Sequence, residues 1–344
     1  MFPASAFAPA SHERSDEGRT AGARWRRRMI AADRVPRWTP HRSGGEVGAR
    51  LSLTTWNLGY AGLGSGSDFV VDGGTHWFPP SRGAVRENRD GIVRQLRSEP
   101  SDVLLLQEIA RGGTANYWTD LKTAVDRSLP EQGCAYLPDI FTRWVPFPFS
   151  LEHGLATYAR ARAESVDAQP LPSDGDLSSG WFKKRYVALV ARFPLASGAG
   201  SWSVINIHLA AFDPAADLRR RQVEAVLSLA QDEHAAGRFV VIGGDWNLRL
   251  ATTAFPYTTE PRHLEWLADF DPACLPPGWR LAADGATASV RTDEKPYVAG
   301  ENYTAVIDGF VVSPNVRVCS VSAVDLGFRH SDHQPVRAVV EAVT

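Results

Sequence analysis

Residues 239–247 combine an apolar run with polar side chains that could do chemistry. Phe-Val-Val-Ile leads into two glycines, and Asp245, Trp246 and Asn247 follow directly. The apolar run is typical of a buried strand, and the glycines allow backbone or ligand to approach closely where the strand ends. Because successive side chains of an extended segment alternate faces, Asp245 and Asn247 would point the same way. The segment presents an acceptor beside a donor, although Asp and Asn also commonly end strands in an ordinary turn.

Similar polar residues end or interrupt other apolar runs of the chain. They are Asn57, Glu108, His208, Asp308, Asp332 and His333. Singly, each has a structural interpretation, such as a turn cap or a hydrogen-bonded core histidine. Burying them is costly unless they are paired, metal-bound or hydrated, so we expect them to share one sheet edge. Carboxylates with Asn and His, without a cysteine pair, suit a hard cation such as Mg²⁺, whose natural partner is phosphate.

The elements that must position these residues follow from apolar periodicity. Strands are expected at 51–57, 103–106, 154–160, 186–192, 202–208, 239–247, 305–312, 316–324 and 336–343. Helices are expected at 86–97 and 118–129, with a third that Asp213 and Pro214 begin and Gly237 stops. Residues 161–180 are predicted to form a polar surface loop, and 255–300 a Pro-rich loop region. The mixture of strands and helices indicates an α/β protein.

Length and composition limit the possible classes of protein. At 344 residues, 44% hydrophobic and 22% charged, the chain can bury a large core. The net charge of -2 gives no global reason to bind nucleic acid or an anionic membrane. The three cysteines lie far apart, which suggests neither a zinc site nor a disulfide framework and favours a reduced compartment. We find no apolar run long enough to span a bilayer and no secretory signal at 1–10, so we expect a cytoplasmic protein.

The first fifty residues differ in composition from the rest. Residues 1–50 mix Ser, Pro, Gly and many Arg without sustained periodicity, so we predict a disordered basic tail. It would either anchor the protein to nucleic acid or acidic lipid, or be a solvated leader. The folded domain is predicted at 51–344.

Seven motifs, in order along the chain, resemble those of the endonuclease/exonuclease/phosphatase (DNase I-like) superfamily. They are Thr55-Trp56-Asn57, Leu106-Gln107-Glu108, residues 154–160, Asn206-Ile207-His208, Gly243-Gly244-Asp245-Trp246-Asn247, Val306-Ile307-Asp308 and Ser331-Asp332-His333. No single motif is specific, but the ordered set is. The resemblance implies a single four-layer α/β (α+β) sandwich domain, in which two mixed β-sheets lie face to face and are flanked by helices.

The resemblance also implies metal ligands. Glu108 would be the principal ligand of Mg²⁺, with Mn²⁺ as a substitute. Asn57 would be a nearby ligand or an orienting group, and Asp332 would hold a metal or support the site. The ion would act as a Lewis acid on a phosphate oxygen.

The same resemblance assigns catalytic roles to five residues. Asp245 would align or deprotonate the attacking water, and Asn247 would hold the phosphoryl oxygen as charge develops. His333 would contact the scissile phosphate, with Asp308 fixing its tautomer. His208 would bind phosphate or protonate the leaving group, as in the deoxyribonuclease-like, sphingomyelinase-like and inositol-phosphatase-like members.

These roles predict a monomeric, Mg²⁺-dependent hydrolase of phosphate esters in which water attacks the phosphorus. Its substrate would be a nucleic acid, a phospholipid head group or a small phosphoester. Alternatives are a phosphomonoesterase, a sphingomyelinase-like phospholipid hydrolase, or a binding module that keeps the fold without catalysis. The Pro-Ala-Trp-Cys-Asp-Arg signature of inositol polyphosphate phosphatases is replaced by residues 303–309, which disfavours that subclass. The loop with Asp68 and Asp72 and the loop around Tyr297 could shape a substrate pocket or be ordinary surface.

Overall fold

The computed structural model describes residues 36–39, 44–142, 150–173, 184–198, 200–211, 213 and 216–343. Pro36–Thr344 forms one compact unit. Within it β1 (Trp38–Thr39) pairs with β4 (Gly133–Thr142), and Val47 bridges to Leu195. The compact unit therefore includes part of the segment predicted as a tail. The rest of that prediction, up to residue 35, lies outside the described residues and stays a prediction.

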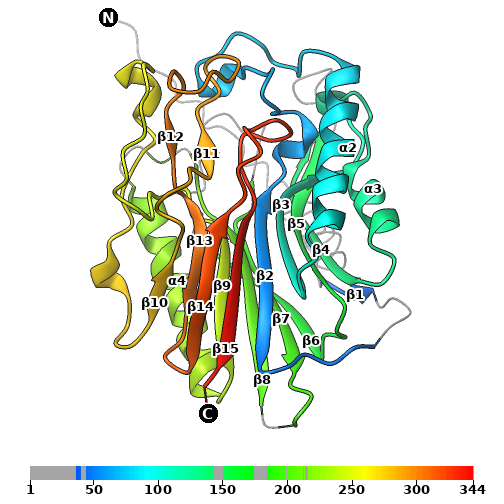
Figure 1. The fold of residues 1–344 in the computed structure, drawn as a ribbon, viewed down its shortest axis with the longest axis vertical. Coiled ribbons are helices and arrows are strands. Elements are labelled where there is room, and N and C mark those ends of the chain that lie inside the picture. The colour runs from blue at the N-terminus through cyan, green and yellow to red at the C-terminus, as the bar shows by residue number, and fades with distance from the viewer. Residues whose placement is uncertain are drawn as a thin grey trace, which may run out of the picture. The chain divides into compact units, whose positions relative to one another are not determined.

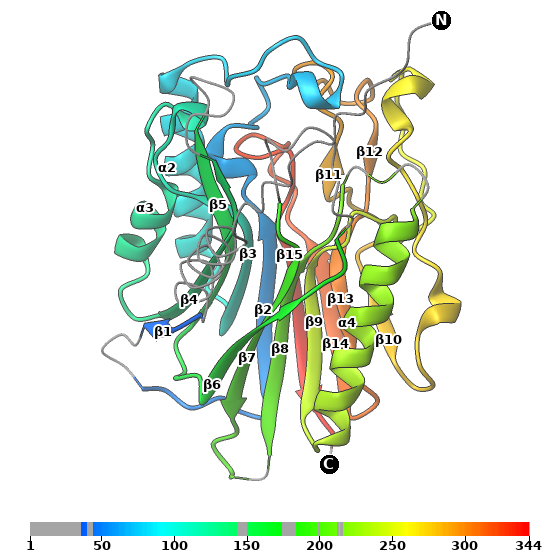
Figure 2. The same ribbon diagram turned by 180° about the vertical axis from the view of Figure 1, so that it is seen from behind.

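Two large sheets form the centre of the unit (Figures 1 and 2). The first has seven strands in the order β1-β4-β5-β3-β2-β15-β14. Its other strands are β2 (Arg50–Asn57), β3 (Val103–Ala110), β5 (Leu151–Ala159), β14 (Val316–Ala323) and β15 (Val336–Ala342). In this sheet β2 and β3 are parallel, and the other paired strands are antiparallel.

The second sheet has six strands in the order β10-β13-β9-β8-β7-β6. They are β6 (Ser165–Pro170), β7 (Val187–Pro194), β8 (Ser201–His208), β9 (Phe239–Asp245), β10 (Arg280–Ala282) and β13 (Asp308–Val312). Here β8 and β9 are the parallel pair, and the remaining pairs are antiparallel. A separate two-stranded hairpin joins β11 (Val290–Arg291) and β12 (Thr304–Ala305).

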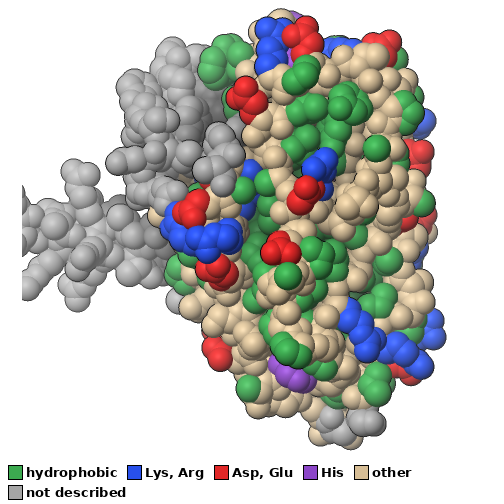
Figure 3. Space-filling model, turned by 90° about the vertical axis from the view of Figure 1, so that its left-hand side faces the viewer, with side chains coloured by type: hydrophobic (Ala, Val, Ile, Leu, Met, Phe, Trp, Pro, Cys, Tyr) green, Lys and Arg blue, Asp and Glu red, His purple; other side chains and the backbone are tan. Residues whose placement is uncertain are grey.

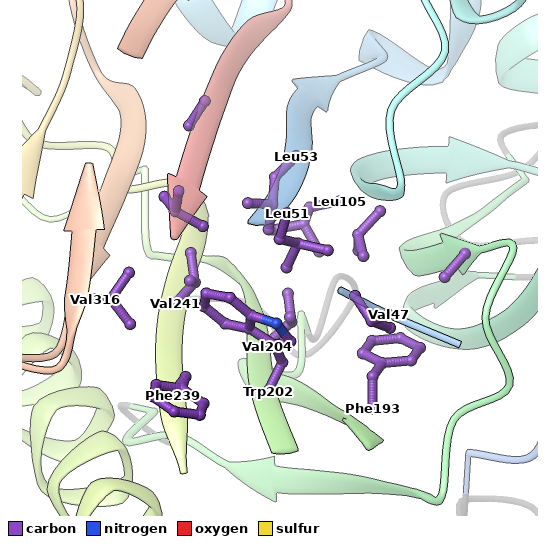
Figure 4. Close-up of a cluster of buried hydrophobic side chains, with 14 of the residues drawn as sticks. Val47, Leu51, Leu53, Leu105, Phe193, Trp202, Val204, Phe239, Val241 and Val316 are labelled. Carbon is purple, nitrogen blue, oxygen red and sulfur yellow. The ribbon is translucent and has the colours of Figure 1, made fainter. Parts of the chain in front are cut away.

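The two sheets pack face to face through alternate residues of their strands, as expected for period-two side chains. Figure 4 shows Leu51 and Leu53 of β2 meeting Trp202 of β8 and Val241 of β9. All four are fully buried. The central strand β9 is buried at every position, because helix α4 (Asp217–Ala235) covers the outer face of its sheet as well.

Three α-helices of the described residues complete four layers. α2 (Arg82–Ser98) and α3 (Leu121–Ser128) pack on the outer face of the first sheet, and α4 (Asp217–Ala235) packs on that of the second (Figures 1 and 2). The connections contain short 3₁₀ turns, at Gly59–Ala61, Val70–Asp72, Thr114–Asn116, Pro261–Leu264 and Pro272–Cys274. The described helices include none that is both long and apolar enough to cross a membrane. The predicted four-layer α/β sandwich is confirmed.

Local chemistry explains the helix ends. The Ser81 hydroxyl caps α2 by accepting from Ala84 N at 3.0 Å, and the Asp120 carboxylate caps α3 by accepting from Thr123 N at 2.8 Å. The prediction that the second helix starts at residue 118 is therefore wrong, since Trp118 has the left-handed backbone (φ 59).

Two other sequence-based expectations differ from the structure. α4 begins at Asp217 rather than at Asp213, whose carboxylate instead accepts from Arg219 N at 2.8 Å. Pro214 lies outside the described residues. The segment predicted as a polar loop contains the edge strand β6, whose polar composition reflects exposure along one side of the sheet.

Candidate active site

The predicted site residues stand at the carboxyl ends of the two parallel strand pairs. Asn57 ends β2 and Glu108 lies near the end of β3, while His208 ends β8 and Asp245 ends β9. Parallel neighbours end at the same edge of a sheet, and such edges commonly bind ligands. The expectation of one shared sheet edge is therefore corrected: both sheets contribute.

Strand register aligns three of the residues in the second sheet. Asp245 pairs with His208 on one side and with Asp308 on the other. Side chains that are directly opposite on neighbouring strands lie on the same face of the sheet. The sheet thus presents an imidazole and two carboxylates in one row.

Asp245 is the residue on which the other polar groups converge. Its Oδ2 accepts from Asn57 Nδ2 at 3.1 Å, and its Oδ1 accepts from the backbone N of Asn247 at 2.9 Å. The same Oδ2 lies 3.5 Å from His208 Nε2 and 3.7 Å from His333 Nε2. The carboxylate is almost fully buried, so its orientation is fixed by these contacts.

His333 is oriented by an aspartate and by its own backbone. Its Nδ1 lies 2.9 Å from Asp308 Oδ2, and its carbonyl oxygen accepts from Trp56 Nε1 at 3.0 Å. Burial lowers the pKa of His333, but the charges of Asp308, Asp245 and Asp332 outweigh burial and raise the pKa well above its usual value. The imidazole therefore presents an Nε2–H toward Asp245.

His208 has the opposite electrostatic character. Burial, followed by the positive charges of Lys184, His153 and His333, lowers its pKa well below the usual value. Lys184 Nζ lies 3.0 Å from His208 Nε2 and 3.1 Å from Nδ1. A neutral imidazole beside an ammonium group is a hydrogen-bonding group rather than a permanent cation.

Glu108 occupies a break in the strand ladder. The pairing of β3 with β5 shifts register between Leu106 and Ile109, and Glu108 has a left-handed backbone (φ 50). Such strain in a residue other than glycine is commonly kept for function, and a bulge can redirect a side chain. Burial raises the pKa of Glu108, opposed by His153 and Lys184. No hydrogen bond to its carboxylate is formed by the described residues, and His208 Nε2 lies 3.9 Å from Oε1.

Asp332 approaches the loop that follows β2. A Cβ on Gly59 (φ 46) would come within 2.6 Å of Asp332 Oδ1, so this close approach requires glycine. Asp332 Oδ1 also accepts from the Ser331 hydroxyl at 3.1 Å. Asn57 Oδ1 accepts from Gly59 N at 3.0 Å. Because both ends of the Asn57 amide already have protein partners, its geometry suits an orienting role.

The donor set of the site fits a hard divalent cation. Asp245, Asp308 and His333 each offer one ligand atom, all within 4.8 Å of one another, and could hold a metal ion. One oxygen of the buried Asp308 carboxylate has no hydrogen-bond partner among the described residues. Glu108 and Asp332 add two further carboxylates and no thiolate is present in this set, which favours Mg²⁺-like ions over soft metals.

Arg219 of α4 supports the site from behind, and the sequence analysis missed it. Its fully buried guanidinium donates to the carbonyl oxygens of Asn247 at 2.6 Å, Trp266 at 2.7 Å and Asp213 at 2.6 Å. Asn247 has a left-handed backbone (φ 50), and its Nδ2 donates to Leu209 O at 3.0 Å. The only sequence signal was an arginine on the apolar face of a predicted helix.

Two further groups near the site were also missed. Lys184 lies beside His208, and His153 with its partner Asp139 lies beside Glu108 along β5 and β4. His153 precedes a glycine within an apolar strand. A polar residue inside such a run was a signal that could have been used.

The chain was compared with known proteins. The model of the Endonuclease/Exonuclease/phosphatase family matches residues 54–333. No curated protein resembles the chain closely enough to match it. A solved endonuclease/exonuclease/phosphatase from Beutenbergia cavernae DSM 12333 is 18% identical, with a TM-score of 0.58 over 86% of this chain and 72% of that chain.

Two other solved structures share the fold. TDP2 from D. rerio, complexed with single strand DNA product, is 13% identical, with a TM-score of 0.53 over 85% of this chain and 99% of that chain. The human Nocturnin catalytic domain with bound sulfate anion is 16% identical, with a TM-score of 0.52 over 90% of this chain and 98% of that chain. At these identities the likeness shows the fold alone. The family model, by contrast, spans most of the chain and both sheets, and by this match the chain belongs to the endonuclease/exonuclease/phosphatase family.

Proposed function

We propose that this protein is a Mg²⁺-dependent hydrolase of phosphate esters, acting on phosphodiesters by direct attack of water. The observation that carries the proposal is the convergence of Asn57, Asn247, His208 and His333 on the buried Asp245 carboxylate. A binding module without catalysis would have no need of such an arrangement, because buried ionisable groups are seldom the most stable choice. Family membership supports the same reaction class.

Asp245, His333 and His208 have different roles in the proposed reaction. Asp245 is the acceptor for a proton of the attacking water, since its carboxylate is held by two hydrogen bonds and faces both imidazoles. His333, protonated and held by Asp308, donates Nε2–H to a phosphoryl oxygen as negative charge develops there. Asn247 adds an amide donor to the same oxygen. His208, neutral, donates to a phosphoryl or leaving oxygen.

Glu108 and Asp332 are the residues that would hold Mg²⁺, with Mn²⁺ as a substitute. When bound, the ion supplies Lewis-acid stabilisation of a phosphoryl oxygen. The alternative set of Asp245, Asp308 and His333 is less suitable, because the 2.9 Å contact between His333 Nδ1 and Asp308 Oδ2 already uses these two groups. Asn57 would orient Asp245 beside the ion.

The charge of the protein bears on the class of substrate. Figure 3 shows one face of the molecule, on which basic and acidic side chains are interspersed. The net charge of -2 likewise gives no global attraction for a nucleic acid. We propose a nucleic acid strand, a phospholipid head group or a small phosphoester as substrate, and a monomeric cytoplasmic enzyme. A phosphomonoesterase and a sphingomyelinase-like enzyme are the alternatives.

The test uses bis(p-nitrophenyl) phosphate, a generic diester. Purified protein should release p-nitrophenol with Mg²⁺ or Mn²⁺ and stop when chelator is added. Glu108→Gln should chiefly raise the Mg²⁺ concentration needed for half-maximal rate, because the amide is a weaker ligand of a hard cation. The surface variant Glu265→Gln is the matched control. Metal-independent hydrolysis that Glu108→Gln leaves intact would refute the proposal.

A further inference from the structure

A second buried histidine–aspartate pair lies beside the proposed active site. His153 Nδ1 is 2.9 Å from Asp139 Oδ1, and the two side chains are 4% and 2% exposed. The distance matches the 2.9 Å between His333 Nδ1 and Asp308 Oδ2. A buried ion pair is seldom more stable than apolar residues of the same volume. The pair therefore calls for a role other than packing.

Two strand irregularities bring the pair to the site. The ladder between β4 and β5 shifts register between Pro138 and Ile140, which places Asp139 at the irregularity. The ladder on the other side of β5 shifts where Glu108 lies. His153 sits on the strand between them. Because bulges redirect side chains and are common beside active sites, two of them flanking one strand indicate a functional arrangement.

The alternation of β5 shows where His153 points. Leu155 packs with Leu189 of the second sheet, and Ala159 belongs to the core between the sheets, whereas Tyr158 packs on the helix side. Residues two apart on a strand share a face. His153 therefore faces the space between the sheets, as Leu155 does.

Electrostatics places His153 near the catalytic groups. Its pKa is lowered by burial, but the charges of Asp139 and Glu108 outweigh burial and raise it. The positive charges of His153 and Lys184 in turn lower the pKa of His208. The backbone agrees, because Arg185 N donates to Asp139 O at 2.9 Å and so brings the neighbouring Lys184, which contacts His208, toward the pair.

Both groups have nitrogens to spare. Among the described residues no partner contacts His153 Nε2, and Nδ1 lies 2.9 Å from Asp139 Oδ1 without forming a hydrogen bond to it. Lys184 Nζ lies beside the ring nitrogens of His208 and 5.4 Å from the centre of the Tyr186 ring, and no described carboxylate forms an ion pair with it. An ammonium without a carboxylate partner, together with an imidazole that has an uncommitted ring nitrogen, is a ready site for an anion.

Resting on the hydrolase activity proposed above, we propose that His153 and Lys184 bind a second phosphoryl group of the substrate, beside the one that is hydrolysed. Asp139 is a positioning residue that holds the His153 ring so that Nε2 faces this group. The substrate class is then a phosphate ester that carries another phosphate. A nucleotide with a second phosphate and a polyol bisphosphate share this chemistry.

The test compares matched pairs of inhibitors of bis(p-nitrophenyl) phosphate hydrolysis at fixed free Mg²⁺. One pair is thymidine 5′-phosphate and thymidine 3′,5′-bisphosphate, and the other is propane-1,3-diol phosphate and its bisphosphate. In at least one pair the bisphosphate should bind about tenfold more tightly, because it adds charge-assisted hydrogen bonds. The pair that shows this preference identifies whether the substrate is a nucleotide or a phosphorylated polyol.

The variants His153→Gln and Lys184→Met should each remove the preference for the bisphosphate. In His153→Gln the inhibition constant of the monophosphate should stay within about twofold, since the subsite for the hydrolysed phosphate is intact. Lys184→Met also loses the contact with His208, so it is judged by the ratio of the bisphosphate and monophosphate inhibition constants alone. Asp139→Asn, which keeps the shape of the pair, replaces His153→Gln if that variant fails to fold. His234→Gln, in the last turn of α4, and Lys295→Met, at an ion pair with Glu301, are the controls and should keep the preference.

Equal binding of mono- and bisphosphates by the parent protein, or a preference that survives in both variants, would overturn the proposal. So would a loss of kcat in His153→Gln without any change in the preference, because that result assigns the pair to the chemical step. Calorimetric binding is measured in parallel. A protein that prefers bisphosphates in calorimetry but hydrolyses nothing would support this subsite and refute only the proposed activity.

Discussion

At the scale of single residues, the charge of Asp245 is what its neighbours are arranged around. Asn57 donates a hydrogen bond to one of its oxygens and the backbone of Asn247 donates to the other. An amide at this position would keep the size of the side chain but would turn its NH2 donor toward one of these two donors. A substitution at this position therefore tests whether the site requires the shape of the Asp245 side chain or its negative charge.

Asp245→Asn should lower kcat on a diester by about two orders of magnitude or more, because the acceptor for the water proton is lost. KM should change little, since interactions that strengthen in the transition state contribute little to ground-state binding. Steady-state kinetics and a thermal melt check this. Asp269→Asn, at an exposed ion pair, is the control. Full turnover, or an unfolded variant, would show that Asp245 is structural.

The pair of His333 and Asp308 predicts a pH effect. Asp308 is the largest charge that raises the pKa of His333, so Asp308→Asn should lower that pKa. The protonated Nε2–H donor would then be lost at lower pH. We expect the alkaline limb of the kcat/KM profile to move to lower pH by at least about one unit. Asp284→Asn, at a carboxylate bonded to Ala323 N, should leave the limb in place. An unmoved limb in Asp308→Asn would contradict the assignment.

At the scale of elements, the ends of β8 and β9 need the backbone to come unusually close. A Cβ on Gly244 (φ 155) would lie 2.1 Å from Ile207 O, so glycine is required one residue before Asp245. Helix α4 then fixes the segment after the strand through Arg219. The strand end is thus held from both sides.

Arg219→Met should both destabilise the protein and slow it. Three buried carbonyl oxygens lose their donor, and one unsatisfied buried partner alone costs about 1–3 kcal/mol. We expect a clear fall in melting temperature and at least about a tenfold fall in kcat, because Asn247 loses its support. Arg220→Met, the next residue, changes only exposed ion pairs with Asp217 and Glu224 and should do neither. Unchanged kcat in Arg219→Met would leave that residue a purely structural role.

The sequence predicted where the strands end better than it predicted which side chains lie next to one another in the fold. Apolar runs ending in Asp245 or His208 were readable because buried strands are nearly continuous apolar segments. The sharing of the site between two sheets was not readable, since periodicity reports which face a residue occupies and not what packs against it. The side-chain directions of Asp139 and Glu108 depend on bulges, so the sequence could place Glu108 at a strand end but could not show which groups its carboxylate faces.

At the scale of the whole molecule, the loop after β2 is tied to the β11–β12 hairpin. Arg291 is fully buried, forms an ion pair with Asp293 and donates to Gly64 O at 2.9 Å. The carbonyl oxygen of Asp293 accepts from Phe69 N at 2.8 Å. These contacts keep Asp72 of the same loop near the site carboxylates. Burial and the charges of Asp332 and Glu108 raise the pKa of Asp72 to about 7.

This arrangement predicts that stability depends on pH and on metal. A carboxyl group with a raised pKa is protonated in the folded protein but ionised in the unfolded chain, so stability falls as pH rises from about 4 to about 7. With chelator, Asp72→Asn should melt higher than the parent at pH 8 and nearly the same at pH 4. Mg²⁺ should raise the parent's melting temperature more at pH 8 than at pH 5, since it offsets the site carboxylates.

Asp68→Asn, in the same loop, should have the opposite effect on the melting temperature. Burial raises the pKa of Asp68, but hydrogen bonds from Thr75 outweigh burial and lower it, so this variant should melt lower than the parent at neutral pH. Thermal denaturation monitored by circular dichroism measures all three proteins. If pH changed the melting temperatures of Asp68→Asn and Asp72→Asn in the same way relative to the parent, the ionisation states assigned to these two aspartates would be wrong.

The position of β15 makes assembly of the candidate site depend on a strand that comes late in the chain. β15 is the last strand along the described chain, and it pairs with both β2 and β14, one strand in from the edge of the first sheet. His333 stands three residues before it and reaches Trp56 on β2 across most of the chain's length. Such long-range pairing forms late in folding. A nascent chain that has already exposed Asp245 therefore still lacks His333 and the strand that follows it, so the proposed site can assemble only after β15 has emerged.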